Sequence, residues 1–491
     1  MALTNPDRFT HSLSEKLSIT SIVFGLVIAL SIVAFILLAE NRIIGSFTGL
    51  PVGSSVLLLG VGLFSVYLIF LNERLWIWIT IAAMLSLVFR PTEGGFGPAE
   101  LIYALYVSLG LVVWFTKETM VYRNQIIYST FDWFLLLAVL LCMCTASIGS
   151  LYFEGSFRLY SREFLSFLSI LLYYPYRKSM QNDRDIIILV GVVVGVALIN
   201  GLNNLATYQQ QVVESALRFG EINARVKSYE LLSVVLICVA FAWLAFTRSI
   251  KTIPVSMAIL VSGIAFLLMT LSRGPIAAAT IGVFLALFLV PPRRAAILIA
   301  AFLTALTGLI LTLLVVLPGF SQSIIGNVTN RIETFERLES DHSFNSRLYE
   351  AKGALKAVAV SPTFGYGYGV RFSFYDKPFQ ITGRTIFIHN GYVAMLYKYG
   401  IPAGLFLMFV LLFPLIRLPF SSLKTMSRNH QMFAVGALTT LVSMLITNFT
   451  SNSISAYISL TLYALCYATL DYVYTGNGYR EGFAQPREKY S

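Results

Sequence analysis

The sequence predicts an all-α polytopic membrane protein with about 12–14 transmembrane helices and one large extramembrane loop. The chain has 491 residues, of which 57% are apolar and 12% are charged, whereas soluble domains carry about 25% charged residues. Many apolar runs approach or exceed the roughly 20 residues that cross a bilayer as a helix. The first run is long and is followed by others, which predicts a membrane span and no cleavable signal peptide.

Hydropathy along the chain places candidate spans in order from the N-terminus to the C-terminus. They lie at residues 18–39, 52–71, 75–89, 99–116, 132–149, 163–176, 186–204, 229–247, 253–271, 275–292, 295–318, 399–416, 431–449 and 453–473. The third and the sixth are short for a bilayer crossing, which is why the total is given as a range.

Basic residues alternate between the short loops on the two sides of this predicted bundle. One set of loops, together with both termini, contains 18 Lys and Arg residues, and the short loops of the opposite set contain 8. Cytoplasmic loops carry the excess of Lys and Arg, and long loops do not count in this rule. We therefore expect both termini in the cytoplasm and the long loop 319–388 on the outer, periplasmic side. Arg273 and His389 then fall at the same outer membrane face.

The net charge of +11 does not favour a nucleic-acid partner, because the Lys and Arg residues are spread over short loops between spans. There they are expected to set the topology and to contact the headgroups of membrane lipids. The cysteines lie in apolar runs without neighbouring metal-type ligands, which predicts packing residues and neither a disulfide nor a metal site. They are Cys142, Cys144, Cys238 and Cys466.

The loop 319–388 is the one substantial polar segment, and short helices are expected inside it. Apolar residues recur at helical spacing over about 346–360, which predicts a helix there. Asn345 or Ser346 is expected to cap its start, and Pro362 ends it. The "GYGYG" that follows predicts a flexible turn close to a ligand or to another backbone, because so many glycines do not form a packed helix.

Two arginines are candidates for binding an anionic ligand at the outer face. Arg347 lies at the start of the helix predicted in the loop. A guanidinium near a helix N-terminus suits a phosphate or pyrophosphate, because it offers paired donors and keeps its charge. Arg273 lies between two apolar runs, where a charged residue is costly and usually lines an internal path.

The other basic residues of the loop have a second interpretation, in which they contact lipid phosphates or pair with nearby acids. The acidic candidates are Glu339, Asp341 and Glu350. This structural interpretation is favoured for Arg371, Lys377 and Arg384.

His389 is the candidate general base. A lone histidine at a membrane interface is commonly structural, but this one is followed by Asn390 and shares its face with two arginines. No second histidine or carboxylate cluster suggests a metal, and a metal-free histidine is suited to accept a proton near neutral pH. His342, in "SDHSFNSR", is the rival candidate. His11 and His430 fall on the cytoplasmic side and receive no role.

Three motifs, taken in order, resemble the O-antigen ligase family, which includes bacterial O-antigen and exopolysaccharide polymerases. They are "SRGPIAA" (272–278), "NSRLYEAKGALKAVAVSPTFGYGYG" (345–369) and "HNGYVAMLYKYGIPAGLF" (389–406). The resemblance covers roughly residues 255–420, whereas the first half of the chain matches only as a string of membrane helices. The specific feature is the order of the motifs around a large outer loop.

The resemblance implies a metal-independent, inverting glycosyltransferase with a GT-C-like membrane fold and no cofactor. Its donor would be a glycan on undecaprenyl pyrophosphate. Arg273 and Arg347 correspond to family arginines that engage the donor pyrophosphate, and His389 corresponds to the family histidine proposed to activate the acceptor hydroxyl. This chain departs from the family at Glu350, where relatives often show an aromatic residue, and Tyr349 is a partial replacement.

The resemblance also divides the chain into three parts. Residues 1–252 are N-terminal transmembrane helices, residues 253–473 form an O-antigen ligase-like catalytic region that includes the periplasmic loop 319–388, and residues 474–491 form a cytoplasmic tail. The expected location is the bacterial inner membrane, with the active site at the periplasmic face.

Four functions remain open from the sequence. A ligase passes the glycan to the lipid A core, which is the favoured interpretation, and a polymerase passes it to another lipid-linked repeat unit. A lipid-linked glycan transporter would show internal repeats and charges near the membrane midplane, but no repeat is evident and the candidate charges gather at one face. A non-catalytic assembly subunit is the last alternative.

Overall fold

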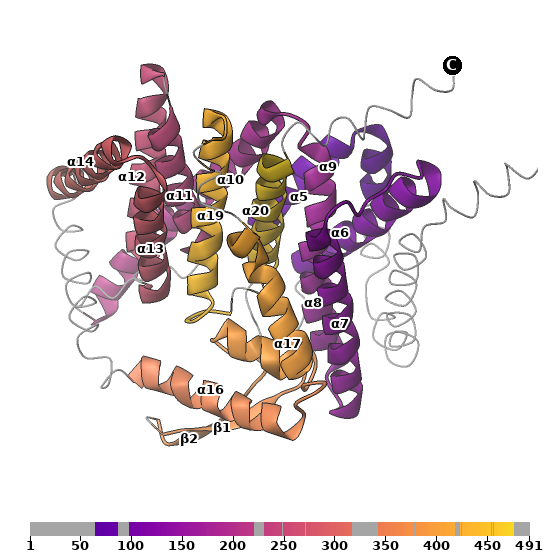
Figure 1. Ribbon diagram of the computed structural model, residues 1–491. Coiled ribbons are helices and arrows are strands. Elements are labelled where there is room, and N and C mark those ends of the chain that lie inside the picture. Colours follow the sequence, from indigo (N-terminus) through magenta and orange to yellow (C-terminus); the bar gives the residue numbers. More distant parts are fainter. Residues whose placement is uncertain are drawn as a thin grey trace, which may run out of the picture.

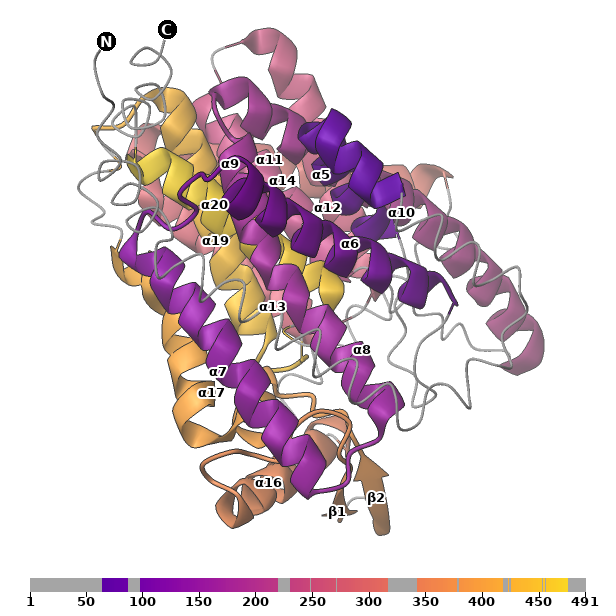
Figure 2. The same cartoon turned by 90° about the vertical axis from the view of Figure 1, so that its right-hand side faces the viewer.

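The computed structural model describes residues 64–86, 98–219, 230–316, 342–417 and 423–475, apart from single positions within them. Long helices form one bundle, and segments distant in sequence lie side by side, as α7 and α17 do (Figures 1 and 2). The helices are α5 Glu73–Ser86, α6 Pro98–Thr116, α7 Thr130–Tyr152, α8 Phe157–Leu168, α9 Tyr173–Ser179, α10 Asp183–Phe219, α11 Glu230–Phe246, α12 Ile253–Thr270, α13 Arg273–Leu289, α14 Pro292–Val316, α16 His342–Val360, α17 Gly391–Arg417, α19 Arg428–Thr447 and α20 Tyr457–Thr475.

The membrane character of the bundle is confirmed. Within the described residues, six helical segments are long and apolar enough to cross a bilayer, namely Tyr103–Val121, Thr130–Tyr152, Asp183–Tyr208, Ile250–Thr270, Gly391–Ile416 and Arg428–Thr447. The helices α11 and α13 are apolar but shorter. The predicted span 18–39 and most of 52–71 lie outside the described residues. The all-α polytopic class is therefore correct, and the total of about 12–14 spans stays a prediction.

The part of the loop that the structure describes forms a layer across one end of the bundle (Figure 1). It contains α16, a 19-residue helix, and an antiparallel hairpin of β1 Phe372–Asp376 and β2 Ile381–Thr385. A helix was expected in this loop and the hairpin was not; Phe372 and Phe374 alternate with exposed residues and give β1 one face to pack on α16.

The start of the loop helix also differs from the prediction. The helix begins at His342 rather than near Ser346, so neither Asn345 nor Ser346 is a capping residue. The Ser346 hydroxyl instead donates a hydrogen bond to the Asp376 carboxylate at the end of β1. This contact fixes the first turns of α16 to the hairpin.

The "GYGYG" turn is packed against other backbones. The sequence predicted that it would lie close either to a ligand or to another backbone. Gly365, Gly367 and Gly369 have φ values of 68°, 81° and 70°, a region that glycine adopts without steric cost. A Cβ at Gly367 would lie 2.2 Å from the carbonyl oxygen of Ala146 in α7. The turn therefore forms a close contact between α7 and the first part of α17.

A break in α17 divides its loop-side part from its membrane-spanning part. Gly400 has φ 75° and ψ 173° inside the helix, and the amides of Tyr366 and Gly367 donate to the carbonyls of Tyr397 and Lys398, at 2.7 and 3.1 Å. The first part of α17 is consequently held by the glycine turn, and with it the residues that precede the helix. These residues include His389.

Candidate functional site

His389 lies in the short connection between the hairpin and α17. Asn390 caps the helix, because its side-chain oxygen accepts hydrogen bonds from the amides of Tyr392 and Val393 at 3.1 and 3.0 Å. The ring of Phe387 packs edge-on against the His389 imidazole, with 5.0 Å between ring centroids. The residue that follows the histidine is therefore fixed by the helix cap, and the imidazole ring itself is packed against Phe387.

A carboxylate that the sequence analysis treated as a departure from the family contacts His389 directly. One oxygen of Glu350 accepts the His389 backbone N–H at 2.5 Å, and the other lies 2.8 Å from Nδ1. The Glu350 side chain is 8% exposed, whereas that of His389 is 38% exposed. Because a carboxylate accepts hydrogen bonds, this arrangement places a proton on Nδ1, so that in the neutral imidazole Nε2 is the acceptor nitrogen.

Arg347 lies one helical turn before Glu350 on α16. Residues three apart share a face of a helix, so the guanidinium and the carboxylate are presented on the same side of α16. Arg347 is half-buried, and its Nη1 donates to the backbone carbonyl of Thr450 at 3.1 Å. Glu350 contacts His389. The sequence had offered Glu350 as an ion-pair partner of Arg371 or Arg384.

Arg273 is the first residue of α13. It follows Ser272, whose hydroxyl donates to the carboxylate of Glu230 at the start of α11. The next residue, Gly274, approaches the loop between α19 and α20 so closely that a Cβ would lie 2.0 Å from the Thr450 hydroxyl oxygen. The beginning of α13 is therefore packed on the same residue that accepts the Arg347 hydrogen bond.

Residues Asn448–Thr450 join all three motifs of the sequence analysis. The Gly391 amide donates to the Asn448 carbonyl at 2.7 Å, and the Asn390 side chain donates to the Phe449 carbonyl at 3.4 Å. Thr450 contacts Arg347 and Gly274, as described above. The segments that contain Arg273, Arg347 and His389 thus meet on three consecutive residues, which we call the α19–α20 junction.

The junction is itself fixed to the bundle. The Asn448 side chain is fully buried, and its Nδ2 donates to the Tyr463 hydroxyl of α20 at 3.0 Å. Neither this junction nor Glu350 was assigned a role from the sequence. The available signal was a polar "TNFTSNS" at residues 447–453, between two apolar runs.

The secondary candidates occupy different positions. Arg371 is exposed directly before β1, Lys377 is exposed after β1, and Arg384 is exposed in β2 opposite Ser373. The Tyr349 ring lies beneath the Lys352 ammonium, 5.6 Å from the ring centroid. The geometry brings Asn390 to the junction.

The other histidines do not change this assignment. His342 is the first residue of α16, and its side chain lies outside the described residues, as does His11. His430 is near the start of α19, where its Nε2 lies 3.3 Å from an Asp183 oxygen. That end of α19 is opposite the end that carries the junction.

Two tyrosines of the glycine turn are unsuited to accept a proton near neutral pH. Burial raises the pKa of the Tyr366 phenol, and it raises the pKa of the Tyr368 phenol well above its usual value. Both side chains therefore stay protonated and neutral. In its neutral form, the imidazole of His389 has an unprotonated ring nitrogen that can accept a proton directly.

The cysteines form no disulfide, and most of them are buried in the bundle. All four cysteines are free thiols, and Cys142, Cys238 and Cys466 are buried. In the part of the chain that the structure describes, no group of three or more His, Cys, Asp or Glu side chains is placed to hold a metal ion. Whether the reaction needs a metal remains a prediction to test.

Comparison with known proteins places the three motifs in one family region. Residues 257–408 match the sequence model of a family described as O-antigen ligase. No curated protein matches the chain. The matched region contains Arg273, Arg347, Glu350 and His389 and ends before the α19–α20 junction. Residues 257–408 of this chain are therefore similar to the O-antigen ligase family.

Proposed function

We propose that this protein, an O-antigen ligase- or polymerase-type membrane enzyme, transfers a glycan from undecaprenyl pyrophosphate to a sugar hydroxyl. The favoured acceptor is the lipid A core, which would make the protein an O-antigen ligase. The transfer takes place at the periplasmic face of the bacterial inner membrane, the side that the charge pattern of the loops predicts for α16 and His389. The reaction uses no metal and no cofactor.

The observation that carries this proposal is the contact between Glu350 and His389. A nucleophilic hydroxyl needs a base, and His389 Nε2 is the nitrogen left to accept its proton. The carboxylate holds the ring in one orientation and stabilises the imidazolium that forms, as the acidic member of a catalytic triad does. Glu350 also shares a face of α16 with Arg347, which supports a base and a donor-binding cation in one site.

In the proposed step, the acceptor oxygen forms a bond to the anomeric carbon of the donor sugar and gives its proton to His389 Nε2. The bond between this carbon and the pyrophosphate oxygen breaks at the same time. Attack from the side opposite the leaving group inverts the anomeric configuration. Undecaprenyl pyrophosphate leaves with the electron pair of the broken bond.

Arg273 and Arg347 stabilise the negative charge that develops on the leaving pyrophosphate. A guanidinium offers paired N–H donors to phosphate oxygens, and it does so with a charge that it does not lose. Fixed cations aimed at developing charge lower the barrier because they need no reorganisation during the reaction. The α19–α20 junction supports this role, since it contacts Arg347 and the start of α13.

The decisive experiment is glycan transfer by the purified full-length protein in lipid vesicles. Undecaprenyl-pyrophosphate glycan is the donor, and lipid A core is the acceptor. We expect transfer by the wild type and a loss of at least about 100-fold in the His389→Ala variant, which removes the base. Equal transfer by an equally folded His389→Ala protein would contradict the proposed base.

The same assay distinguishes the acceptors and the metal requirement. Lengthening of the donor glycan in the absence of lipid A core, without transfer to that core, would identify a polymerase. Addition of EDTA is expected to leave the rate unchanged. A rate that falls with EDTA and returns with Mg²⁺ or Mn²⁺ would contradict the metal-independent mechanism.

A further inference from the structure

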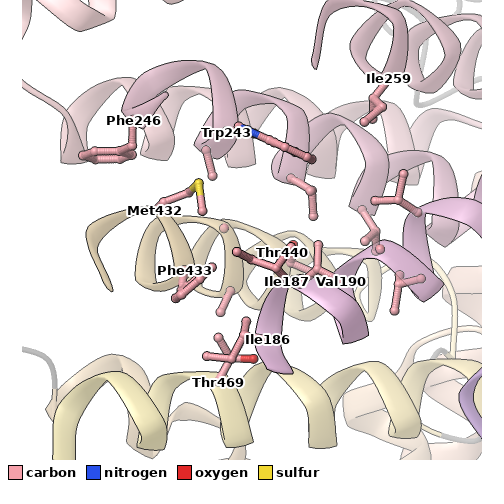
Figure 3. A pocket seen from close by; sticks show the side chains of 18 of the residues that line it. Ile186, Ile187, Val190, Trp243, Phe246, Ile259, Met432, Phe433, Thr440 and Thr469 are labelled. Atoms are coloured by element: carbon pink, nitrogen blue, oxygen red, sulfur yellow. The ribbon is translucent and has the colours of Figure 1, made fainter. Parts of the chain in front are cut away.

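A large cavity lies inside the bundle, away from the candidate site. Its volume is about 1050 Å³, at the upper end of the range for small-molecule pockets. Helices α10, α11, α12, α19 and α20 surround it, and its walls are mostly apolar. Figure 3 shows Ile186 and Val190 of α10, Trp243 of α11 and Phe433 of α19 around this space.

The charged residues of the cavity and several polar neighbours lie at one end. They include Asp183, Thr247, Arg428 and Asn429, which lie at or directly beside the ends of α10, α11 and α19. Nη2 of Arg428 donates to the Thr247 carbonyl at 2.9 Å. The Asp183 carboxylate accepts a hydrogen bond from the Asn429 side chain at 2.8 Å. The rim therefore holds one guanidinium and one carboxylate in fixed positions.

This rim lies at the membrane face opposite His389. The helix α19 runs for 20 residues from Arg428 at the rim to Thr447 beside the α19–α20 junction. A helix of this length spans about 30 Å, which equals the hydrocarbon thickness of a bilayer. A molecule with its polar group at the rim therefore has that group one membrane thickness away from the base, so it is not the donor pyrophosphate.

We propose that this cavity binds a zwitterionic phospholipid with an ammonium headgroup, taken from the leaflet opposite the candidate site. An apolar cavity offers water few polar partners, whereas acyl chains match its walls. The phosphate of such a lipid pairs with Arg428, and its ammonium group pairs with Asp183. Trp243 lies three residues before the end of α11, where an aromatic side chain suits the level of the headgroups.

The entrance to the cavity is on α10. Gly191 and Gly195 are both lining residues, and a Cβ at either position would have nothing within 4 Å. They are four residues apart and so share one face of the helix. Gly191 and Ile187 are exposed as well as lining, so the cavity is accessible to lipid from this side. A larger side chain at Gly195 enters the cavity without displacing a neighbour.

The test is native mass spectrometry of the full-length protein, released from nanodiscs that contain equal amounts of phosphatidylethanolamine and phosphatidylglycerol. We expect a single-lipid adduct in the wild type that is enriched in phosphatidylethanolamine. Gly195→Leu should abolish this adduct, and Gly308→Leu should keep it. Gly308 is the matched control because it lies on α14, does not line the cavity and also has open space at its Cβ position.

Two rim variants test the headgroup contacts separately. Asp183→Asn should remove the preference for phosphatidylethanolamine and keep the adduct, and Arg428→Gln should reduce adducts of both lipids. A wild-type protein with no adduct, an adduct with the mass of a polyprenyl lipid, or an adduct equally retained in Gly195→Leu would overturn the proposal. A dimer that lacks lipid would also overturn it and would indicate that a second copy covers these glycines. None of these measurements depends on glycan transfer.

Discussion

Glu350 gives His389 a defined chemical state. A histidine without a partner can rotate and can carry its neutral-state proton on either ring nitrogen. Here one carboxylate accepts both the backbone N–H and the Nδ1 proton of the same residue, at 2.5 and 2.8 Å. Glu350 itself is almost fully buried. A carboxylate there has little access to water, so these two hydrogen bonds replace its hydration. Glu350 is therefore proposed as a positioning residue that acts through the imidazole.

Substitution of Glu350 tests this role. Glu350→Gln keeps the size of the side chain but replaces one of the two acceptor oxygens by an N–H donor, so it cannot accept both the backbone N–H and the Nδ1 proton of His389. We expect kcat for glycan transfer to fall by about 10²-fold, as for loss of a general base, while KM for the donor changes little. Lys356→Gln on the exposed side of α16 is the control and should transfer like the wild type. A Glu350→Gln enzyme with normal kcat would show that the carboxylate is only structural.

Arg347 is tested by a substitution that retains its charge. Arg347→Lys keeps a cation, but an ammonium group does not offer the paired donors of a guanidinium. If the pyrophosphate is bound through paired hydrogen bonds, we expect a fall of about 10-fold or more in kcat/KM for the donor, equivalent to about 1.4 kcal/mol. The effect of Arg347→Ala should be larger than that of Arg347→Lys. Equal activity of all three proteins would remove Arg347 from the donor site.

At the scale of elements, the site depends on close contacts between segments that are far apart in the chain. The α19–α20 junction contacts the start of α13, the first turns of α16 and the start of α17. The glycine turn fixes α17 from its other side, where Gly400 adopts a positive φ. The positions of Arg273 and His389 are therefore set by helix ends and tight turns rather than by the middle of any helix.

Gly274 provides a test of the contact between α13 and the junction. A Cβ at this position would lie 2.0 Å from the Thr450 hydroxyl oxygen, so Gly274→Ala must displace Arg273 or Thr450. We expect a loss of glycan transfer in this variant, although its helix propensity is improved.

A double variant separates this clash from general damage to the fold. Thr450→Ala removes the atom that the new Cβ would meet first, and it keeps the backbone carbonyl that Arg347 contacts. Gly274→Ala combined with Thr450→Ala should therefore recover part of the activity, which a double-mutant cycle measures as a coupling energy. Gly191→Ala, where a Cβ meets nothing within 4 Å, is the matched control. If the losses of activity in Gly274→Ala and Thr450→Ala simply add in the double variant, the clash with Thr450 is not the cause of the Gly274→Ala defect.

At the scale of the whole molecule, the two ends of the bundle differ in character. One end carries α16, the hairpin and the candidate base (Figure 1). The other end carries a buried ionic cluster in which Arg177 contacts Asp132 at 2.5 Å and Asp471 at 2.6 Å. The excess of Lys and Arg in the loops on the side of Arg177 predicts that this end faces the cytoplasm.

The orientation of the whole molecule can be tested directly with single cysteines. Lys356→Cys in α16 should react with a membrane-impermeant maleimide added to intact spheroplasts, because α16 is expected to face the periplasm. Lys251→Cys, at an exposed position in a loop predicted to face the cytoplasm, should react only after the membrane is permeabilised. Reaction in the reverse order would overturn the topology and the periplasmic site with it. The four native cysteines can first be replaced, because none of them forms a disulfide.

The class of the protein follows from its apolar runs alone, because runs of membrane-spanning length have few other stable structures in lipid. The sequence also indicates three functional candidates, since Arg273, Arg347 and His389 are unusual residues beside apolar runs. The contacts that each of them makes are seen only in the folded protein. The pairing of Glu350 with His389 joins residues 39 positions apart, and the contact of Arg347 with Thr450 joins residues 103 positions apart. Such contacts depend on how helix ends pack in three dimensions, and the spacing of residues along one chain carries no measure of that packing.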